Sequence, residues 1–115
     1  MANAKARPKA GKPKAHHTFV ALADPTRRQV FERLQSGGLS VGEIARHLPV
    51  SRPAVSQHLK VLKDAGLVAD RADGTRRVYH IDPHGLAAIR QWLDQFWEGA
   101  LARFAEEVER SEDKS

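Results

Sequence analysis

The chain has 115 residues, of which 41% are hydrophobic, and this is enough for one domain with a single core. It contains no cysteine, which excludes disulfide scaffolds, thiolate metal sites and cysteine nucleophiles. No apolar run approaches the ~20 residues that a membrane span requires, and no signal peptide begins the chain. We therefore expect a soluble, cytoplasmic protein without a membrane partner.

The net charge of +5 is distributed unevenly along the chain. Residues 1–17 carry five Lys/Arg and no acid, residues 18–81 carry ten against six, and residues 82–115 carry four against eight. The chain is therefore basic at its front and middle and acidic at its end. This distribution indicates an anionic partner, nucleic acid above all.

Residues 1–15 consist almost entirely of Ala, Lys, Pro and Gly, so they have nothing to bury. We expect a disordered basic tail that either keeps the protein soluble or acts as a loose arm for phosphates. One folded domain is predicted over 16–110, followed by a disordered acidic end over 111–115.

Four helices are predicted at the start of the domain, the first from about His17. The next three begin at the N-caps Asp24 (followed by Pro25), Ser40 (in a capping box with Glu43) and Ser51. They are expected to end at Gly37-Gly38, Pro49 and Gly66. The apolar residues at helical spacing are, in chain order, Phe19, Val20 and Leu22; Val30, Phe31 and Leu34; Val41, Ile44, Ala45 and Leu48; and Val55, Leu59 and Leu62.

The apolar period then changes to two, which is typical of strands. Residues 67–71 and 76–81 flank Asp73-Gly74, a strong hairpin-turn signal. Asp82-Pro83 then caps a helix that runs to about Arg110, ~28 residues or ~42 Å. Two short helices joined by a tight turn and followed by a two-stranded ribbon predict a winged helix-turn-helix. The fold class is mainly α with a two-stranded β-wing (α+β), in the order of four helices, two strands and a last helix.

The helix over 51–65 has a small, polar to basic face opposite its apolar stripe. A small residue such as Ala54 lets a helix approach base edges closely. Gln57 can pair with adenine and Arg52 with guanine. The residues better suited to phosphates are Ser51, Ser56, Lys60 and Lys63. The alternative is an ordinary solvated helix face.

Three arginines, Arg71, Arg76 and Arg77, surround the predicted hairpin turn. Guanidinium groups at a hairpin tip can reach phosphates or enter a narrow minor groove. Charged residues also protect a ribbon from pairing with other chains. Three arginines within seven residues exceed that need, so DNA contact is the favoured interpretation.

Three stretches carry a resemblance to a known family: Leu-Ala-Asp-Pro-Thr-Arg at 22–27, Ser-Arg-Pro-Ala-Val-Ser-Gln-His-Leu-Lys-Val-Leu at 51–62, and Ala-Gly-Leu-Val at 65–68. Together they resemble the ArsR family of bacterial winged-helix repressors. The resemblance covers about residues 18–98, and its Ser-Gln-His-Leu-Lys-x-Leu run is a specific signature.

The resemblance implies a homodimer that binds an inverted-repeat operator and blocks transcription. It implies that Arg52, Ser56 and Gln57 enter the major groove. His58 matches the signature but lies at the edge of the apolar stripe, so phosphate contact and structural packing both stay open. The lack of cysteine and the aromatic, acidic last helix resemble a subgroup that often lacks a known metal and behaves as autorepressors.

Many members of the family sense metals, and they do so at two kinds of site. At the positions that match the family's cysteine pair, this chain has Ser40 and Gly42, which supply no thiolate. The other family site is Asp-x-His followed by a His and then a His or Glu. The matching residues are Asp82, His84, Gln95 and Glu98. One imidazole is missing from a four-ligand zinc site, so we expect no metal and no cofactor; a zinc-responsive repressor with a degenerate site is the alternative.

The last helix holds four of the seven aromatic residues, including Trp92. Its apolar stripe is too wide for the surface of one small domain, so we expect the first helix to cover part and a second chain the rest. The alternative is packing within one chain. The predicted dimer interface comprises Phe19, Leu86, Ile89, Leu93, Phe96, Trp97, Leu101 and Phe104.

The sequence thus predicts a sequence-specific DNA-binding transcriptional regulator, a homodimeric repressor acting on double-stranded operator DNA in the cytoplasm at the nucleoid. It names no small-molecule effector. An enzyme is not expected, because no catalytic constellation, phosphate-binding glycine loop or paired carboxylates are visible. The rival interpretation is a non-specific DNA-compacting protein, since the Lys/Pro/Ala tail is typical of such proteins.

Overall fold

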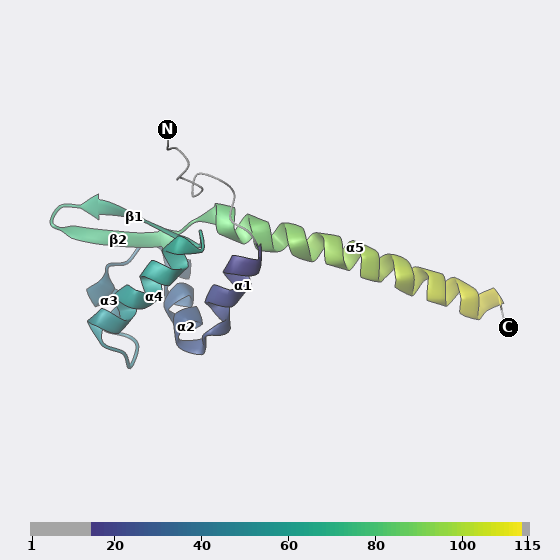
Figure 1. The fold of residues 1–115 in the computed structure, drawn as a ribbon, viewed down its shortest axis with the longest axis horizontal. Helices are drawn as coiled ribbons and strands as arrows, with labels where there is room; N and C mark the ends of the chain where they lie inside the picture. Colours follow the sequence, from purple (N-terminus) through teal and green to yellow (C-terminus); the bar gives the residue numbers. More distant parts are fainter. Residues whose placement is uncertain (1–14, 114–115) are drawn as a thin grey trace, which may run out of the picture.

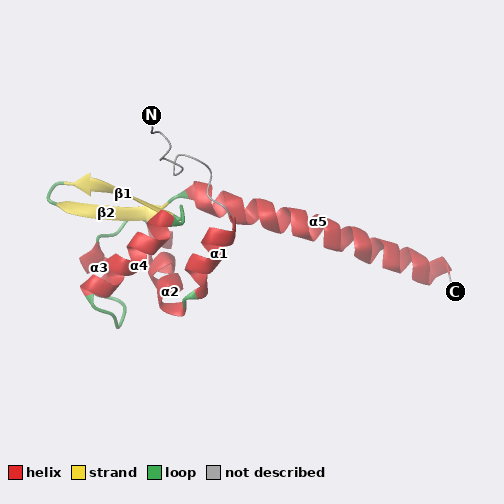
Figure 2. Ribbon diagram, viewed as in Figure 1, coloured by secondary structure: helices red, strands yellow, loops and turns green. Residues whose placement is uncertain are grey.

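The structure, a computed structural model, describes residues 15–113. The tail predicted over 1–15 therefore lies outside the described residues except for Ala15, the first residue of α1. The elements are α1 (Ala15–Ala23), α2 (Pro25–Arg33), a 3₁₀ turn η2 (Leu34–Ser36), α3 (Val41–Ala45), α4 (Arg52–Asp64), β1 (Val68–Asp73), β2 (Arg76–Ile81) and α5 (Pro83–Asp113). The predicted order of four helices, two strands and a last helix is confirmed. The wing and α5 extend from the helical body in opposite directions (Figure 1 and Figure 2).

Side-chain caps fix the starts of the helices, as predicted. The Asp24 side chain accepts a hydrogen bond from the Arg27 backbone N–H at 2.9 Å. Ser40 and Glu43 form a complete capping box, and the Ser51 hydroxyl accepts from the Ala54 backbone N–H at 3.2 Å. Each cap satisfies backbone donors that the first turn of a helix leaves free.

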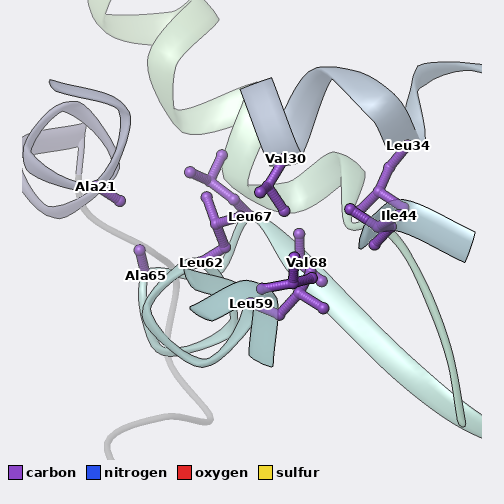
Figure 3. Close-up of a cluster of buried hydrophobic side chains, with 10 residues drawn as sticks. Ala21, Val30, Leu34, Ile44, Leu59, Leu62, Ala65, Leu67 and Val68 are labelled. Atoms are coloured by element: carbon purple, nitrogen blue, oxygen red, sulfur yellow. The ribbon is translucent and has the colours of Figure 1, made fainter. Parts of the chain in front are cut away.

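The core lies where α2, α3 and α4 meet the start of the wing. Val30, Ile44, Leu59, Leu62 and Leu67 are completely buried. Figure 3 shows these side chains, drawn from different elements, pointing toward one another. Full burial of one such side chain contributes about 1.5–3 kcal/mol, so this cluster holds the helical body together.

The third helix is shorter than predicted. It ends at Ala45, and the chain then turns through 46–50 before the next helix. The backbone N–H groups of His47 and Leu48 bond three residues back, at 3.2 and 3.4 Å. Pro49 disfavours helical geometry in the residue before it, which explains why the helix is lost before the proline is reached.

The wing hairpin is turned one residue later than predicted. Asp73 still pairs with Arg76, so the loop is Gly74-Thr75 and not Asp73-Gly74. Gly74 has φ of +67°, and no other residue type in the described chain adopts a positive φ. A two-residue hairpin with glycine at its first position matches the twist of the strands, so Gly74 determines the loop.

The first helix presents a different face from the one its apolar residues suggested. Thr18 and Ala21 are buried, whereas Phe19 and Val20 are exposed and Leu22 is half-buried. The Thr18 hydroxyl donates to the Ala15 carbonyl at 2.7 Å, which satisfies it inside the protein. The two exposed residues are therefore left on the surface.

The last helix extends to Asp113, three residues beyond the predicted end at Arg110 and into the segment expected to be disordered. Its 31 residues span about 46 Å. Gly85, in its first turn, crosses the backbone of Gly66, and a Cβ added to Gly85 would collide with the Gly66 carbonyl. None of the helices within residues 15–113 is long and apolar enough to cross a membrane.

Candidate nucleic-acid interface

The α4 helix presents the polar face that the sequence predicted. Val55, Leu59 and Leu62 are buried in the core and fix the orientation of the helix. The exposed residues on or beside this face are Ser51, Arg52, Pro53, Ser56, Gln57, Lys60 and Lys63. Ala54 is half-buried, and its small side chain lets a partner approach the backbone of α4 closely.

Arg52 is exposed at the start of α4, but its guanidinium lies beside α3. A Cβ built on Gly42 would lie 3.0 Å from Arg52 Nη2, so the missing side chain at Gly42 makes room for the guanidinium. Arg52 forms no ion pair with the described residues, so its charge is free to meet an anion.

His58 is half-buried, and its Nδ1 is buried without a hydrogen-bond partner among residues 15–113. It lies near the junction of α1 and α2. The pKa of Asp24 is lowered there, chiefly by the Arg27 backbone N–H and further by the charges of Arg27 and His58. This placement favours packing, the second of the two roles that the sequence left open for His58.

The wing is bound to the helical body through the backbone. Leu39 and Tyr79 exchange two hydrogen bonds, N to O at 2.9 and 2.8 Å, so the segment before α3 pairs with β2. Gly38 allows this approach, because a Cβ at that position would lie 2.6 Å from Val78 Cγ1. The wing therefore has a fixed position beside α3.

Most of the cations predicted to contact DNA are paired with carboxylates. Asp70 binds both Lys63 Nζ at 2.7 Å and Arg77 Nε at 3.4 Å. The hydrogen bond and the charge of Asp70 raise the pKa of Lys63. On α4, Lys60 pairs with Asp64 at 3.2 Å in an exposed i,i+4 pair.

The arginine beside the loop of the wing, Arg76, also pairs with carboxylates. Arg76 lies 3.5 Å from Glu43, the acid of the α3 capping box, and 3.8 Å from Asp73. The backbone N–H of Ser40 lowers the pKa of Glu43, and Arg76 contributes to that shift. Arg71 is exposed and forms no ion pair with the described residues.

These pairings were missed in the sequence. The register pairs Asp70 with Tyr79, which places Arg77 diagonally across the ribbon on the same face. Hairpin register could therefore have suggested the contact between Asp70 and Arg77. The contact with Lys63 depends on how α4 packs against the wing, and no local signal contains it.

Two of the residues at the family's second metal position, Asp82 and His84, contact each other. Asp82 accepts hydrogen bonds from the His84 backbone N–H at 3.0 Å and lies 2.9 Å from His84 Nδ1. Burial opposes ionisation of Asp82, but the His84 hydrogen bonds and charge outweigh it and lower the pKa. Gln95 and Glu98 follow on α5, Gln95 about 16 Å from His84 along the axis. Among residues 15–113, no three His, Cys, Asp or Glu side chains are grouped to hold a metal.

A second surface runs along α1 and α5. The ring centroids of Phe19 and Trp92 lie 5.2 Å apart in an edge-to-face contact, and those of Trp92 and Phe96 lie 5.6 Å apart in a stacked contact. Phe96 and Trp97 make a second edge-to-face contact, with a distance of 6.3 Å between ring centroids. Of the eight residues predicted for a dimer interface, Ile89 is half-buried against the core. The other seven are all exposed: Phe19, Leu86, Leu93, Phe96, Trp97, Leu101 and Phe104.

Comparisons with known proteins agree with this geometry. Residues 22–71 match the family described as the helix-turn-helix domain. The HTH-type transcriptional regulator Rv2034 of Mycobacterium tuberculosis is 63% identical over 95 residues, covering 83% of this chain and 89% of that protein. The transcriptional repressor SdpR of Bacillus subtilis is 33% identical over 81 residues, covering 70% of this chain and 90% of that protein.

A solved structure shares the fold. The ArsR-like transcriptional regulator from Rhodococcus sp. RHA1 superposes with a TM-score of 0.71 at 30% identity, covering 79% of this chain and 86% of that one. These relatives are transcriptional regulators and not enzymes. The chain belongs to the ArsR family of DNA-binding, winged helix-turn-helix transcriptional repressors.

Proposed function

We propose that this repressor acts as a homodimer on an inverted-repeat operator, in the cytoplasm at the nucleoid. The observation that carries the proposal is the exposed face of α4, held rigidly by the core and flanked by a wing in a fixed position. Arg52, Ser56 and Gln57 read base edges from the major groove, and the neighbouring cations contact phosphates.

The predicted phosphate contacts are Ser51, Lys60, Lys63, Arg71, Arg76 and Arg77, with Ala54 close to the bases. Arg52 and Arg71 are available at once, since neither forms an ion pair with the described residues. The other four cations, Lys60, Lys63, Arg76 and Arg77, face carboxylates of the protein. Their contribution therefore depends on how the DNA is seated.

The apolar surface of α1 and α5 supports a dimer. Seven of its predicted residues are exposed, and Phe104 retains 66% of its accessible area. An apolar surface of this kind on a small protein is typical of an interface, and like faces of two chains pair by a twofold axis. In the proposed dimer we expect the two α4 helices about 34 Å apart, one turn of DNA, the spacing at which helix-turn-helix dimers bind two half-sites.

The proposal is tested by selecting bound fragments from genomic DNA with the full-length protein, with and without added zinc. Recovered fragments should share two inverted half-sites with centres about 10 base pairs apart. A specificity ratio of about 10³ or more over scrambled duplex is expected, whereas a DNA-compacting protein shows little preference. Recovered fragments that share no sequence motif would contradict the proposal. A set of bound fragments that changes when zinc is added would support the zinc-responsive alternative.

Base reading by α4 has its own test. Gln57→Ala should weaken discrimination at one or two operator positions by about 1–3 kcal/mol. Gln95→Ala, an exposed glutamine on α5, is the matched control and should leave discrimination unchanged. Equal weakening of all sequences by Gln57→Ala would show that this side chain does not read bases.

A further inference from the structure

Asp70 connects the two parts of the molecule that meet DNA. It lies on β1, with only 10% of its side chain exposed. Its Oδ1 pairs with Lys63 Nζ on α4 at 2.7 Å, and its Oδ2 lies 3.4 Å from Arg77 Nε on β2. One carboxylate therefore joins α4 to both strands of the wing.

The surroundings of Asp70 differ from those of Asp64, the acid that pairs with the other lysine of α4. Asp64 pairs with Lys60 on the same helix, and both side chains are more than two-thirds exposed. Water and salt screen such a pair, so it constrains its lysine little. Asp70 is largely enclosed and is screened less, so it restrains two cations more firmly.

The two cations remain accessible from outside. Lys63 and Arg77 each keep 54% of their side-chain area exposed although Asp70 is enclosed. Each cation contacts the enclosed carboxylate of Asp70, while about half of its side chain is exposed to solvent. A phosphate can reach them only where it meets that fixed arrangement, whereas freely moving side chains could follow phosphates on any duplex.

We propose that Asp70 is a positioning residue that makes DNA binding selective, by holding Lys63 and Arg77 in the one arrangement that fits a correctly seated operator. The inference rests on the proposed function of α4 and the wing. Without Asp70, both side chains contact phosphates of any sequence. Affinity for unrelated DNA then rises, and the ratio between operator and unrelated DNA falls.

The test measures binding of the full-length protein to a scrambled duplex over a range of salt concentrations. Asp70→Asn should steepen the slope of log affinity against log salt by about 1–2, because each added phosphate contact contributes about 0.9. Affinity for scrambled DNA should rise on the order of fivefold per added contact near 0.15 M salt. Asp64→Asn removes the same charge and should leave the slope nearly unchanged.

A further variant separates positioning from charge alone. Asp70→Glu keeps the carboxylate and should restore most of the wild-type slope. Equal slopes in Asp70→Asn and Asp64→Asn would overturn the inference, since the effect would then be one of net charge. A wild-type specificity ratio near one contradicts the proposed function instead, so the two failures are distinguishable.

Lys63 supplies the same test if Asp70→Asn does not fold. On scrambled DNA, Lys63→Gln should leave the salt slope nearly unchanged, because Asp70 already withholds that lysine. Lys60→Gln should reduce the slope by about 0.9, because the exposed pair with Asp64 restrains Lys60 little and leaves it able to contact phosphate. An equal loss of slope in both lysine variants would contradict the role of Asp70.

Discussion

The winged body (residues 15–82) and the α5 arm (residues 83–113) differ in how their apolar side chains are covered. In the body, the side chains of Ile44 and Leu59 are completely enclosed. Several exposed cations there, among them Lys63 and Arg76, face a carboxylate. Along the arm, Trp97 and Phe104 keep more than half of their area in water. The core of the body is enclosed by its own elements, whereas the arm has an apolar surface that residues 15–113 leave uncovered. Stability and assembly can therefore be altered separately.

The largest expected effect is a cavity in the body. Leu59→Ala should lower the free energy of unfolding by about 2–5 kcal/mol, because the site is sealed on all sides. Leu101→Ala removes the same atoms from the exposed arm and is the control. Urea denaturation at low protein concentration measures both. Equal losses would contradict the contrast between body and arm.

The junction of the two regions comes next. Gly85→Ala should cost about 1–3 kcal/mol, because the new methyl group meets the Gly66 backbone, which cannot turn away. Gly99→Ala, on the same helix with open space around it, should instead stabilise by up to about 1 kcal/mol. Thermal unfolding of the two variants side by side gives the sign of each change.

Assembly is addressed on the arm alone. Phe96→Ala should weaken association of the proposed dimer by more than about 1 kcal/mol, since buried aromatic residues dominate interfaces. Sedimentation at several concentrations measures this. Unfolding at low concentration should change little, because Phe96 is exposed in the single chain. A fall in stability at low concentration without a change in association would place Phe96 in the body instead.

A smaller effect is expected at a helix cap. Ser40→Ala removes the hydroxyl of the α3 capping box and should cost about 1 kcal/mol. Ser36→Ala, an exposed serine in η2, serves as the control. Urea midpoints suffice to compare them, and a similar change in both would show that the capping box contributes little.

The smallest expected change in stability is that caused by acidification. The pKa values of Asp24 and Glu43 are lowered in the folded protein, from 3.8 and 4.5. Their stabilising effect is therefore complete above those values and is lost as the pH falls through the lowered pKa. Circular dichroism during acid titration should show this loss below about pH 4, and Asp24→Asn should reduce it. Both groups lie in the body, so a variant with an altered arm should lose stability at the same pH.

The features that were predicted correctly from the sequence are those determined by residues close to one another in the chain. The caps at Asp24, Ser40 and Ser51 and the turn at Gly66 depend on residues within a few positions, and the structure confirms them. Apolar spacing also identified the buried face of α4, because that helix packs on one side only. The family followed from the signature run on the same helix and is confirmed by the relatives.

Features that depend on distant contacts were missed or misplaced. Which face of α1 is buried depends on where α5 begins, so the burial of Thr18 was not predicted and Val20 was not recognised as a surface residue. The wing loop was misplaced by one residue because Asp73-Gly74 and Gly74-Thr75 are both acceptable turns locally. Asp70 was overlooked because its partner Lys63 becomes a neighbour only after the wing folds against α4. The roles of α4 and the wing in contacting DNA stay predictions.

The crossing of Gly85 over Gly66 has a consequence for the geometry of regulation. These two glycines fix the direction in which α5 leaves the body, and in the proposed dimer that direction determines how far apart the two α4 helices lie. The spacing between operator half-sites is then encoded in a pair of residues that never approach a base. In the proposed dimer, we expect a substitution there to change the half-site spacing that is recognised while leaving the sequence preference of each half-site intact.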